Sequence, residues 1–312
     1  MIELIQNGDT GLSIRSKLNH LIEITNVPPS AINPNYLINS AFQVAQAATS
    51  ATITAGTATP TASLGYPVVD SWFCYSVGGN PTLAQVAGSN TTANRLQLTG
   101  AASITSVGIG QRLEAINTTS LANKTVTLSF ECSNSLLTSL TVVANRPTTT
   151  ANTFGTIATP TKTLINSTNV AINSTLTRYS LTFTCPQDVN KGLEILFVLG
   201  AQTSGTFVLA NVKLEEGSVA TPYVSSDFAS ELARCQRYFF AGDTGASYNP
   251  GPAGGNDFIS VAVHFPVQMR SAPTITGVLG VVVSKNVMSC AQYSVPGSWN
   301  NGSPFIASAY IP

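Results

Sequence analysis

Side chains that could catalyse a reaction are few in this sequence, and their spacing does not suit catalysis. The two histidines, His20 and His264, fit no Ser/His/Asp or Cys/His arrangement that the sequence supports. Glu215 and Glu216 are adjacent, so a strand would point them to opposite faces and they could not act as a carboxylate pair. There is no HExxH motif, Walker loop or Cys/His metal spacing. We therefore expect a protein that is not an enzyme.

Aromatic and amide side chains offer a different chemistry, the binding of sugars. A sugar is held by an exposed aromatic ring beside neutral hydrogen-bonding groups. Trp299 and Asn300 lie in a turn-rich segment, residues 295–303, and are predicted ligand contacts. Tyr248 and Asn249 form a second candidate pair in an earlier loop. Packing of Trp299 against a neighbouring subunit is the alternative and is about equally well supported.

The overall charge excludes several kinds of partner. Fourteen basic and fourteen acidic side chains give a formal net charge of zero, and charged residues make up only 9% of the 312 residues. No basic surface field is therefore available for nucleic acid or an anionic membrane. A hydrophobic content of 43% argues against disorder. The first residues do not resemble a signal peptide, and no apolar run is long enough to span a membrane, so we expect no membrane insertion.

The five cysteines are widely spaced and contain no CxxC pair. Since free cysteine is commonly buried as a small hydrophobic residue, we predict reduced thiols in the core of a protein that folds in a cytosol. A bond between Cys132 and Cys185, across neighbouring strands, is the alternative.

Alternating polar and apolar residues predict antiparallel strands. Residues 125–132 and 178–185 alternate strictly, which is typical of strands with one face on a core and the other in water. Trp72 lies in an apolar strand pattern and is expected in the core. The run 193–199 is apolar on both faces apart from Glu194, which indicates a central strand. Further strands are predicted at residues 95–98, 104–113, 140–144, 163–165, 206–217, 258–267 and 274–279.

Two short helices are predicted outside the sandwich. Ile14, Leu18 and Leu21 form a narrow apolar stripe that suits a seam between identical chains, or equally a contact with the same chain's sandwich. The second helix covers residues 226–239, with Ser226 or Asp227 as its N-cap. Its predicted apolar face consists of Phe228, Leu232, Cys235 and Phe239. We therefore predict an all-β jelly-roll sandwich (34–224) between an N-terminal helix and linker (1–33) and a unit formed by a helix and a smaller β domain (225–312).

Four segments resemble a known family. Residues 36–43 are similar to the opening strand of jelly-roll modules of the carbohydrate-binding type, and residues 211–223 are similar to the closing strand of such modules in tailed-bacteriophage fibres. Residues 231–239 resemble the helix that commonly follows, and residues 265–274 resemble the start of the terminal β domain. The chain lacks the extended shaft of a long fibre.

The resemblance implies a virion protein that folds in the host bacterial cytoplasm and assembles as a homotrimer. Its N-terminal segment would attach to other virion proteins, and its other end would contact a host cell-surface glycan. The alternative is a purely architectural collar or head fibre without a ligand. Carbohydrate-binding jelly rolls often hold a structural calcium ion, but acidic residues are scarce here, so we expect no cofactor.

Overall fold

The described part of the chain is almost entirely β-structure. The computed structural model describes residues 10, 34–56, 66–88, 94–156, 159–243, 258–277, 279–293 and 304–311. Residues Asn35–Pro312 form one compact unit, whose paired strands all run antiparallel. Among the residues described, no helix is both long and apolar enough to cross a bilayer.

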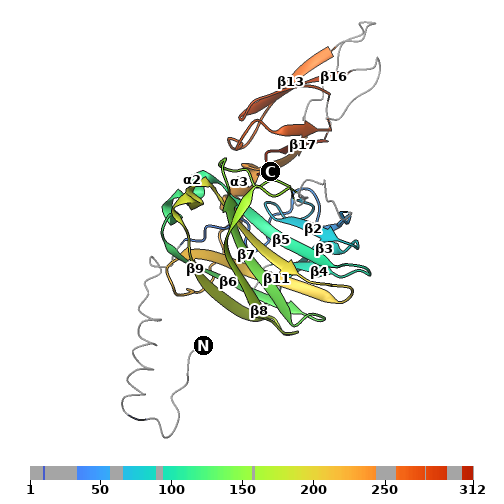
Figure 1. Cartoon of the computed structure of the whole chain (residues 1–312). Helices are drawn as coiled ribbons and strands as arrows, with labels where there is room; N and C mark the ends of the chain where they lie inside the picture. Colours follow the sequence, from blue (N-terminus) through green and yellow to red (C-terminus); the bar gives the residue numbers. More distant parts are fainter. Residues whose placement is uncertain are drawn as a thin grey trace. The chain divides into compact units, whose positions relative to one another are not determined.

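Most of this unit is a jelly-roll sandwich of two sheets (Figure 1). The six-stranded sheet has the order β1 (Ser50–Thr52), β3 (Thr82–Ala87), β4 (Asn94–Thr99), β11 (Thr206–Glu216), β6 (Thr125–Asn134) and β9 (Thr177–Thr184). The five-stranded sheet has the order β2 (Phe73–Val77), β5 (Ser106–Leu113), β10 (Leu193–Leu199), β7 (Ser139–Pro147) and β8 (Lys162–Ala171). From β4 to β7, successive strands alternate between the two sheets, so strands far apart in sequence become neighbours. The predicted fold class is confirmed.

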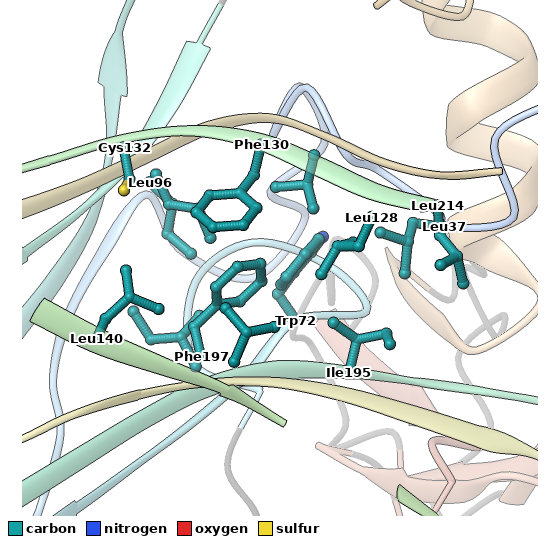
Figure 2. Packing of buried hydrophobic residues seen from close by; sticks show 14 of the residues in the cluster. Leu37, Trp72, Leu96, Leu128, Phe130, Cys132, Leu140, Ile195, Phe197 and Leu214 are labelled. Carbon is teal, nitrogen blue, oxygen red and sulfur yellow. The ribbon is translucent and has the colours of Figure 1, made fainter. Parts of the chain in front are cut away.

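Strand β6 shows why the alternating sequence forms a sandwich. Val126, Leu128 and Phe130 of β6 are fully buried between the sheets. The ring of Phe130 packs edge-on against Phe197 of β10, with 4.9 Å between the centroids, and so connects the two sheets (Figure 2). As predicted, β10 is a central strand, paired with β5 on one side and β7 on the other.

Trp72 lies within this core, as predicted (Figure 2). Its side chain has no exposed surface, and its ring packs edge-on against Phe42 at 5.1 Å. The indole N–H donates to the carbonyl oxygens of Ile38 and Asn39, at 3.1 Å from each. This buried donor therefore ties the core to the turns at residues 38–39.

Residues 36–44 do not form the opening strand that the resemblance implied. They form turns, because Asn39 and Phe42 have φ values of 52° and 55°, in the left-handed region that a strand excludes. The Asn39 amide donates to the carbonyls of Val44 and Asp70 at 2.7 and 3.0 Å and accepts from the Val44 N–H at 3.0 Å. Asparagine tolerates this backbone conformation better than most residues because its short amide bonds locally.

Replacing Asn39 by alanine is expected to lower the free energy of unfolding by about 2–4 kcal/mol. The change removes three hydrogen bonds of about 1 kcal/mol each and leaves a β-carbon at a positive φ. Asn39→Gly removes the same bonds but tolerates the backbone, so it should be less damaging by about 1 kcal/mol. Urea unfolding monitored by tryptophan fluorescence measures both values. Equal losses in the two variants would contradict the assigned backbone strain.

Two buried charges on β11 hold the chain that follows this strand. Lys213 and Glu215 lie 3.1 Å apart with almost no exposed side-chain surface. Glu215 accepts from the Thr221 N–H and hydroxyl at 2.8 and 2.6 Å, and Lys213 donates to the same hydroxyl. Gly217, with φ of 109°, allows the turn that brings Thr221 back. In the segment 211–223, residues up to Glu216 belong to β11, and Lys213 and Glu215 hold the residues that follow against the sandwich.

The predicted helix after the sandwich is α3 (Phe228–Gln236). Asp227 is its N-cap and accepts from the Ser230 N–H at 3.0 Å. Glu231 is buried, and its carboxylate accepts from the backbone N–H of Asn39 at 2.6 Å. The helix is thus fixed to the turns at the start of the sandwich by a charge-assisted bond.

One part of the predicted apolar face of α3 is wrong. Cys235 and Phe239 are buried as expected, but the Phe228 side chain is 56% exposed. The buried residues of α3 are Glu231 and Cys235, so its buried surface begins about one turn after Phe228.

The C-terminal residues form the smaller β domain that the sequence predicts. One three-stranded sheet has the order β12 (Phe239–Asp243), β17 (Pro304–Ser308) and β14 (Thr274–Thr276), and the other has the order β13 (Phe258–His264), β16 (Val287–Tyr293) and β15 (Leu279–Val283). Phe265, Met269, Met288 and Phe305 are buried in a common cluster. This small core is separate from the core of the sandwich.

Cys74, Cys132, Cys185 and Cys235 are free and buried. The prediction of reduced core thiols is confirmed for these four, and the alternative bond between Cys132 and Cys185 is wrong. Burial raises the pKa of both the Cys132 and the Cys185 thiol to about 12. These thiols therefore stay protonated and unreactive at neutral pH.

Candidate functional site

The site residues predicted from the sequence all fall in segments that the structure does not describe. The ligand candidates Trp299, Asn300, Tyr248 and Asn249 lie outside the described residues. The same holds for the predicted association stripe of Ile14, Leu18 and Leu21. These assignments stay predictions.

The adjacent glutamates Glu215 and Glu216 do not share a site. Glu215 is buried against Lys213, whereas Glu216 pairs with Lys124 at 2.9 Å on the surface. The two glutamates thus make separate ion pairs, as the strand pattern predicts. Within the described residues, no three His, Cys, Asp or Glu side chains gather as potential metal ligands.

A candidate binding surface lies on the outward face of the five-stranded sheet. Its strands contribute one residue each to a row that crosses the sheet, as the strand register shows: Tyr75, Gly108, Val198, Thr141 and Asn169. We call this set the open row. On β5, β10 and β7 both strand neighbours of the row residue are core residues, and on β2 Cys74 is one, so the open row faces away from the core. Asn169 is exposed, and the other three side chains are half-buried.

Two glycines on β5 make room for aromatic rings of β2, Gly108 for Tyr75 and Gly110 for Phe73. A β-carbon at Gly108 would come within 2.1 Å of the Tyr75 ring, and one at Gly110 would come within 2.6 Å of the Phe73 ring. Glycine inside a strand often marks such a close approach. Phe73 is buried, whereas Tyr75 keeps part of its surface exposed. Gly108 therefore sets the position of the Tyr75 ring in the open row, and Gly110 that of the buried Phe73 ring.

The Tyr75 hydroxyl stays neutral over the ordinary pH range. Burial, and then the negative charge of Glu194, raises the pKa of Tyr75 to about 12, although a hydrogen bond with Ser106 opposes this. A neutral phenol both donates and accepts hydrogen bonds. With the hydroxyl of Thr141 and the amide of Asn169, the open row carries an aromatic ring and three neutral polar groups.

Further along the same outward face, the sheet carries charges that neutralise one another. Glu194 accepts from Arg112 at 2.8 Å, from Asn145 at 3.0 Å and from Lys162 at 2.5 Å. Burial alone would raise the pKa of Glu194, but the charges of Lys162 and Arg112 outweigh it and lower the pKa. The Arg112 guanidinium lies over the Phe154 ring at 4.9 Å. This end of the face is therefore occupied by paired charges, whereas the open row contains no charged side chain.

Comparison with known proteins finds weak structural similarity to two kinds of solved structure. No family model and no curated protein sequence matches it. It resembles the enzymatically active domain of tailspike protein 4 from bacteriophage CBA120, with 15% identity and a TM-score of 0.34, over 47% of this chain and 19% of that chain. A xylan-binding domain from Paenibacillus barcinonensis has 13% identity and a TM-score of 0.33, over 60% and 97% of the two chains. A family 11 carbohydrate-binding module from Clostridium thermocellum, in complex with a mixed-linked tetrasaccharide, has 14% identity and a TM-score of 0.32, over 54% and 96%.

Structural similarity this weak does not identify a ligand, so the candidate site is defined by the chain's own residues. Tyr75 lies in the same apolar sequence pattern as Trp72, and no neighbouring residue indicates that one ring is buried and the other partly exposed. A signal was nevertheless present: Gly108 and Gly110 recur at the strand period inside a predicted strand. Only the pairing of β2 with β5 shows that these glycines receive the rings of Tyr75 and Phe73.

Proposed function

We propose that the chain is a non-enzymatic fibre protein of a tailed-bacteriophage particle, and that its sandwich binds a neutral host-surface glycan at the open row. The observation that carries the glycan assignment is the partly exposed Tyr75 ring, held over Gly108 at one end of a row whose other end carries the uncharged polar groups of Thr141 and Asn169. Sugars stack their apolar faces on aromatic rings and hydrogen-bond to such groups.

The virion assignment is supported by three segments that resemble parts of phage fibres, residues 211–223, 231–239 and 265–274. In this proposal the chain is a homotrimer that folds in the host bacterial cytoplasm, where the free thiols of its core stay reduced. The N-terminal segment attaches to other virion proteins. Trp299 and Tyr248 remain predicted contacts of the C-terminal domain with the host surface.

Tyr75→Ala is expected to weaken binding to a neutral glycan about 10-fold or more, because a well-packed aromatic contact contributes over 1 kcal/mol. An array of neutral bacterial surface glycans would identify a ligand for the purified chain, and calorimetry would measure the two affinities. Thr182→Ala is the matched control, since Thr182 is exposed on the other sheet of the sandwich.

Two results would contradict the glycan assignment. The first is unchanged affinity in a folded Tyr75→Ala protein, verified by circular dichroism. The second is the absence of binding to any glycan on the array. Either result would favour the architectural collar or head fibre.

A further inference from the structure

A cavity of about 320 Å³ lies where α3 meets the start of the sandwich. Its lining comprises Asn35, Tyr36, Ile38, Asn117, Arg234, Arg237 and Tyr238, which we call the arginine pocket. The volume is at the lower end of the range for small-molecule sites. It suits a ligand the size of a single sugar residue.

Two guanidinium groups form one wall of the arginine pocket. Arg234 lies in the last turn of α3, and Arg237 is its C-cap residue, so the two side chains are three residues apart on one face. Their side chains are 38% and 34% exposed. Both positive charges are therefore accessible from the cavity.

The acidic partners of these arginines lie behind them. Glu231 accepts from Arg234 at 3.3 Å, and Glu114 accepts from two nitrogens of Arg237 at 2.9 and 3.2 Å. The side chains of Glu231 and Glu114 are only 6% and 5% exposed, and neither lines the cavity. The glutamates thus orient the two guanidiniums, and of these four side chains only the arginines line the cavity.

Each arginine keeps hydrogen-bonding capacity for a ligand. Arg234 also donates to the Leu37 carbonyl at 3.2 Å, but a guanidinium carries five N–H donors and these contacts occupy only part of the set. Arginine pairs well with carboxylate and phosphate because its planar donors match two oxygens at once.

The rest of the arginine pocket is neutral and polar. Asn117 lies on the short helix α2 (Ala115–Thr118) and is exposed where it lines the cavity. The Tyr36 hydroxyl is 3.2 Å from Ser120, and the Tyr238 hydroxyl donates to Glu114 at 2.9 Å. Phenol and amide groups beside two cations suit a hydroxylated ligand that carries one anionic group.

We propose that the arginine pocket binds a sugar that carries an oxyanion, either a carboxylate or a phosphate. Since the chain has no net charge, recognition depends on the two local guanidiniums and not on a general field. This site is separate from the open row and does not depend on glycan binding there.

Calorimetric titration of the full chain with sodium glucuronate, glucose 6-phosphate and glucose tests the proposal. At least one anionic sugar should bind 10-fold or more tightly than glucose, and its affinity should fall as salt is raised. The tighter of the two distinguishes carboxylate from phosphate. Equal affinity for glucose, or no binding of either anionic sugar at millimolar concentration, would overturn the proposal.

Substitutions locate the site. Arg234→Gln should weaken binding of the anionic sugar at least 10-fold, and Asn117→Ala, which touches no ion pair, about 3-fold. Arg146→Gln is the matched control, because Arg146 pairs with Asp188 at 2.6 Å and does not line the cavity. Unchanged affinity in Asn117→Ala and in a folded Arg234→Gln would overturn the proposal. Tyr75→Ala should leave this affinity unchanged, so failure at one site is distinguishable from failure at the other.

Discussion

Replacing Glu194 by alanine is expected to lower the free energy of unfolding by about 3–5 kcal/mol. Glu194 is fully buried, and Arg112, at 2.8 Å, is 2% exposed, so the variant leaves a buried guanidinium without its counter-charge. Lys162 is 23% exposed and can turn toward water, so most of the loss arises from Arg112. Guanidinium chloride unfolding of the variant and the wild type measures the difference.

Two further variants distinguish the cost of an unpaired buried charge from the cost of losing an ion pair. Glu216→Ala is the matched control, because Glu216 and Lys124 are 43% and 51% exposed and such surface pairs contribute at most about 1 kcal/mol. The double variant Arg112→Met with Glu194→Met should recover much of the stability, since it removes both buried charges. A loss in Glu194→Ala no larger than that in Glu216→Ala would contradict the assignment.

The same group predicts a pH dependence. The neighbouring Lys162 and Arg112 charges, which outweigh the effect of burial, hold the pKa of Glu194 below its ordinary value of 4.5 in the folded protein. The unfolded chain therefore binds the proton more readily, so the stability contributed by Glu194 is fully present above pH 4.5 and is lost as the pH falls below it. Stability measured across this acidic range should fall less steeply in Glu194→Ala than in the wild type.

Trp72→Ala is expected to cost about 3–5 kcal/mol of unfolding free energy, the range for deleting a large buried aromatic side chain. The substitution empties the core beside Phe42 and removes the donor that bonds the carbonyls of Ile38 and Asn39. Urea unfolding monitored by far-ultraviolet circular dichroism is the suitable measurement, because the variant loses one of the two tryptophans.

Trp72→Phe separates the two causes. It keeps a buried ring and loses the N–H, so it should cost about 1–2 kcal/mol. The Ile38 carbonyl also accepts from Gln111 at 2.7 Å and keeps a partner in both variants. A Trp72→Ala protein that loses less than the phenylalanine variant would show that this part of the core is not tightly packed.

Strands with a regular side-chain period were predictable because the period is a local property. The alternation of residues 125–132 and 178–185 appears as β6 and β9, which pair with each other, and the apolar run 193–199 is the central strand β10. The opening segment was not predictable in this way. Its turns depend on the Asn39 amide, whose partners include the distant Asp70 carbonyl.

The candidate sites depend still more on long-range pairing. Tyr75 lies partly exposed in the open row because β2 pairs with β5 and places its ring over Gly108. The arginine pocket exists because α3 docks beside Asn35 and Asn117, which are distant in sequence. Composition gave no hint of two arginines at one cavity, since it reports only a net charge of zero.

By itself, then, the sequence determined the β-sandwich, the capped helix and the zero net charge of the chain, because each follows from neighbours along the chain or from a sum over it. Only the tertiary structure decided which aromatic ring remains accessible, where Glu194 finds its counter-charges and which arginines face a cavity. Burial and close contact between distant residues decide these properties, and no local pattern encodes them.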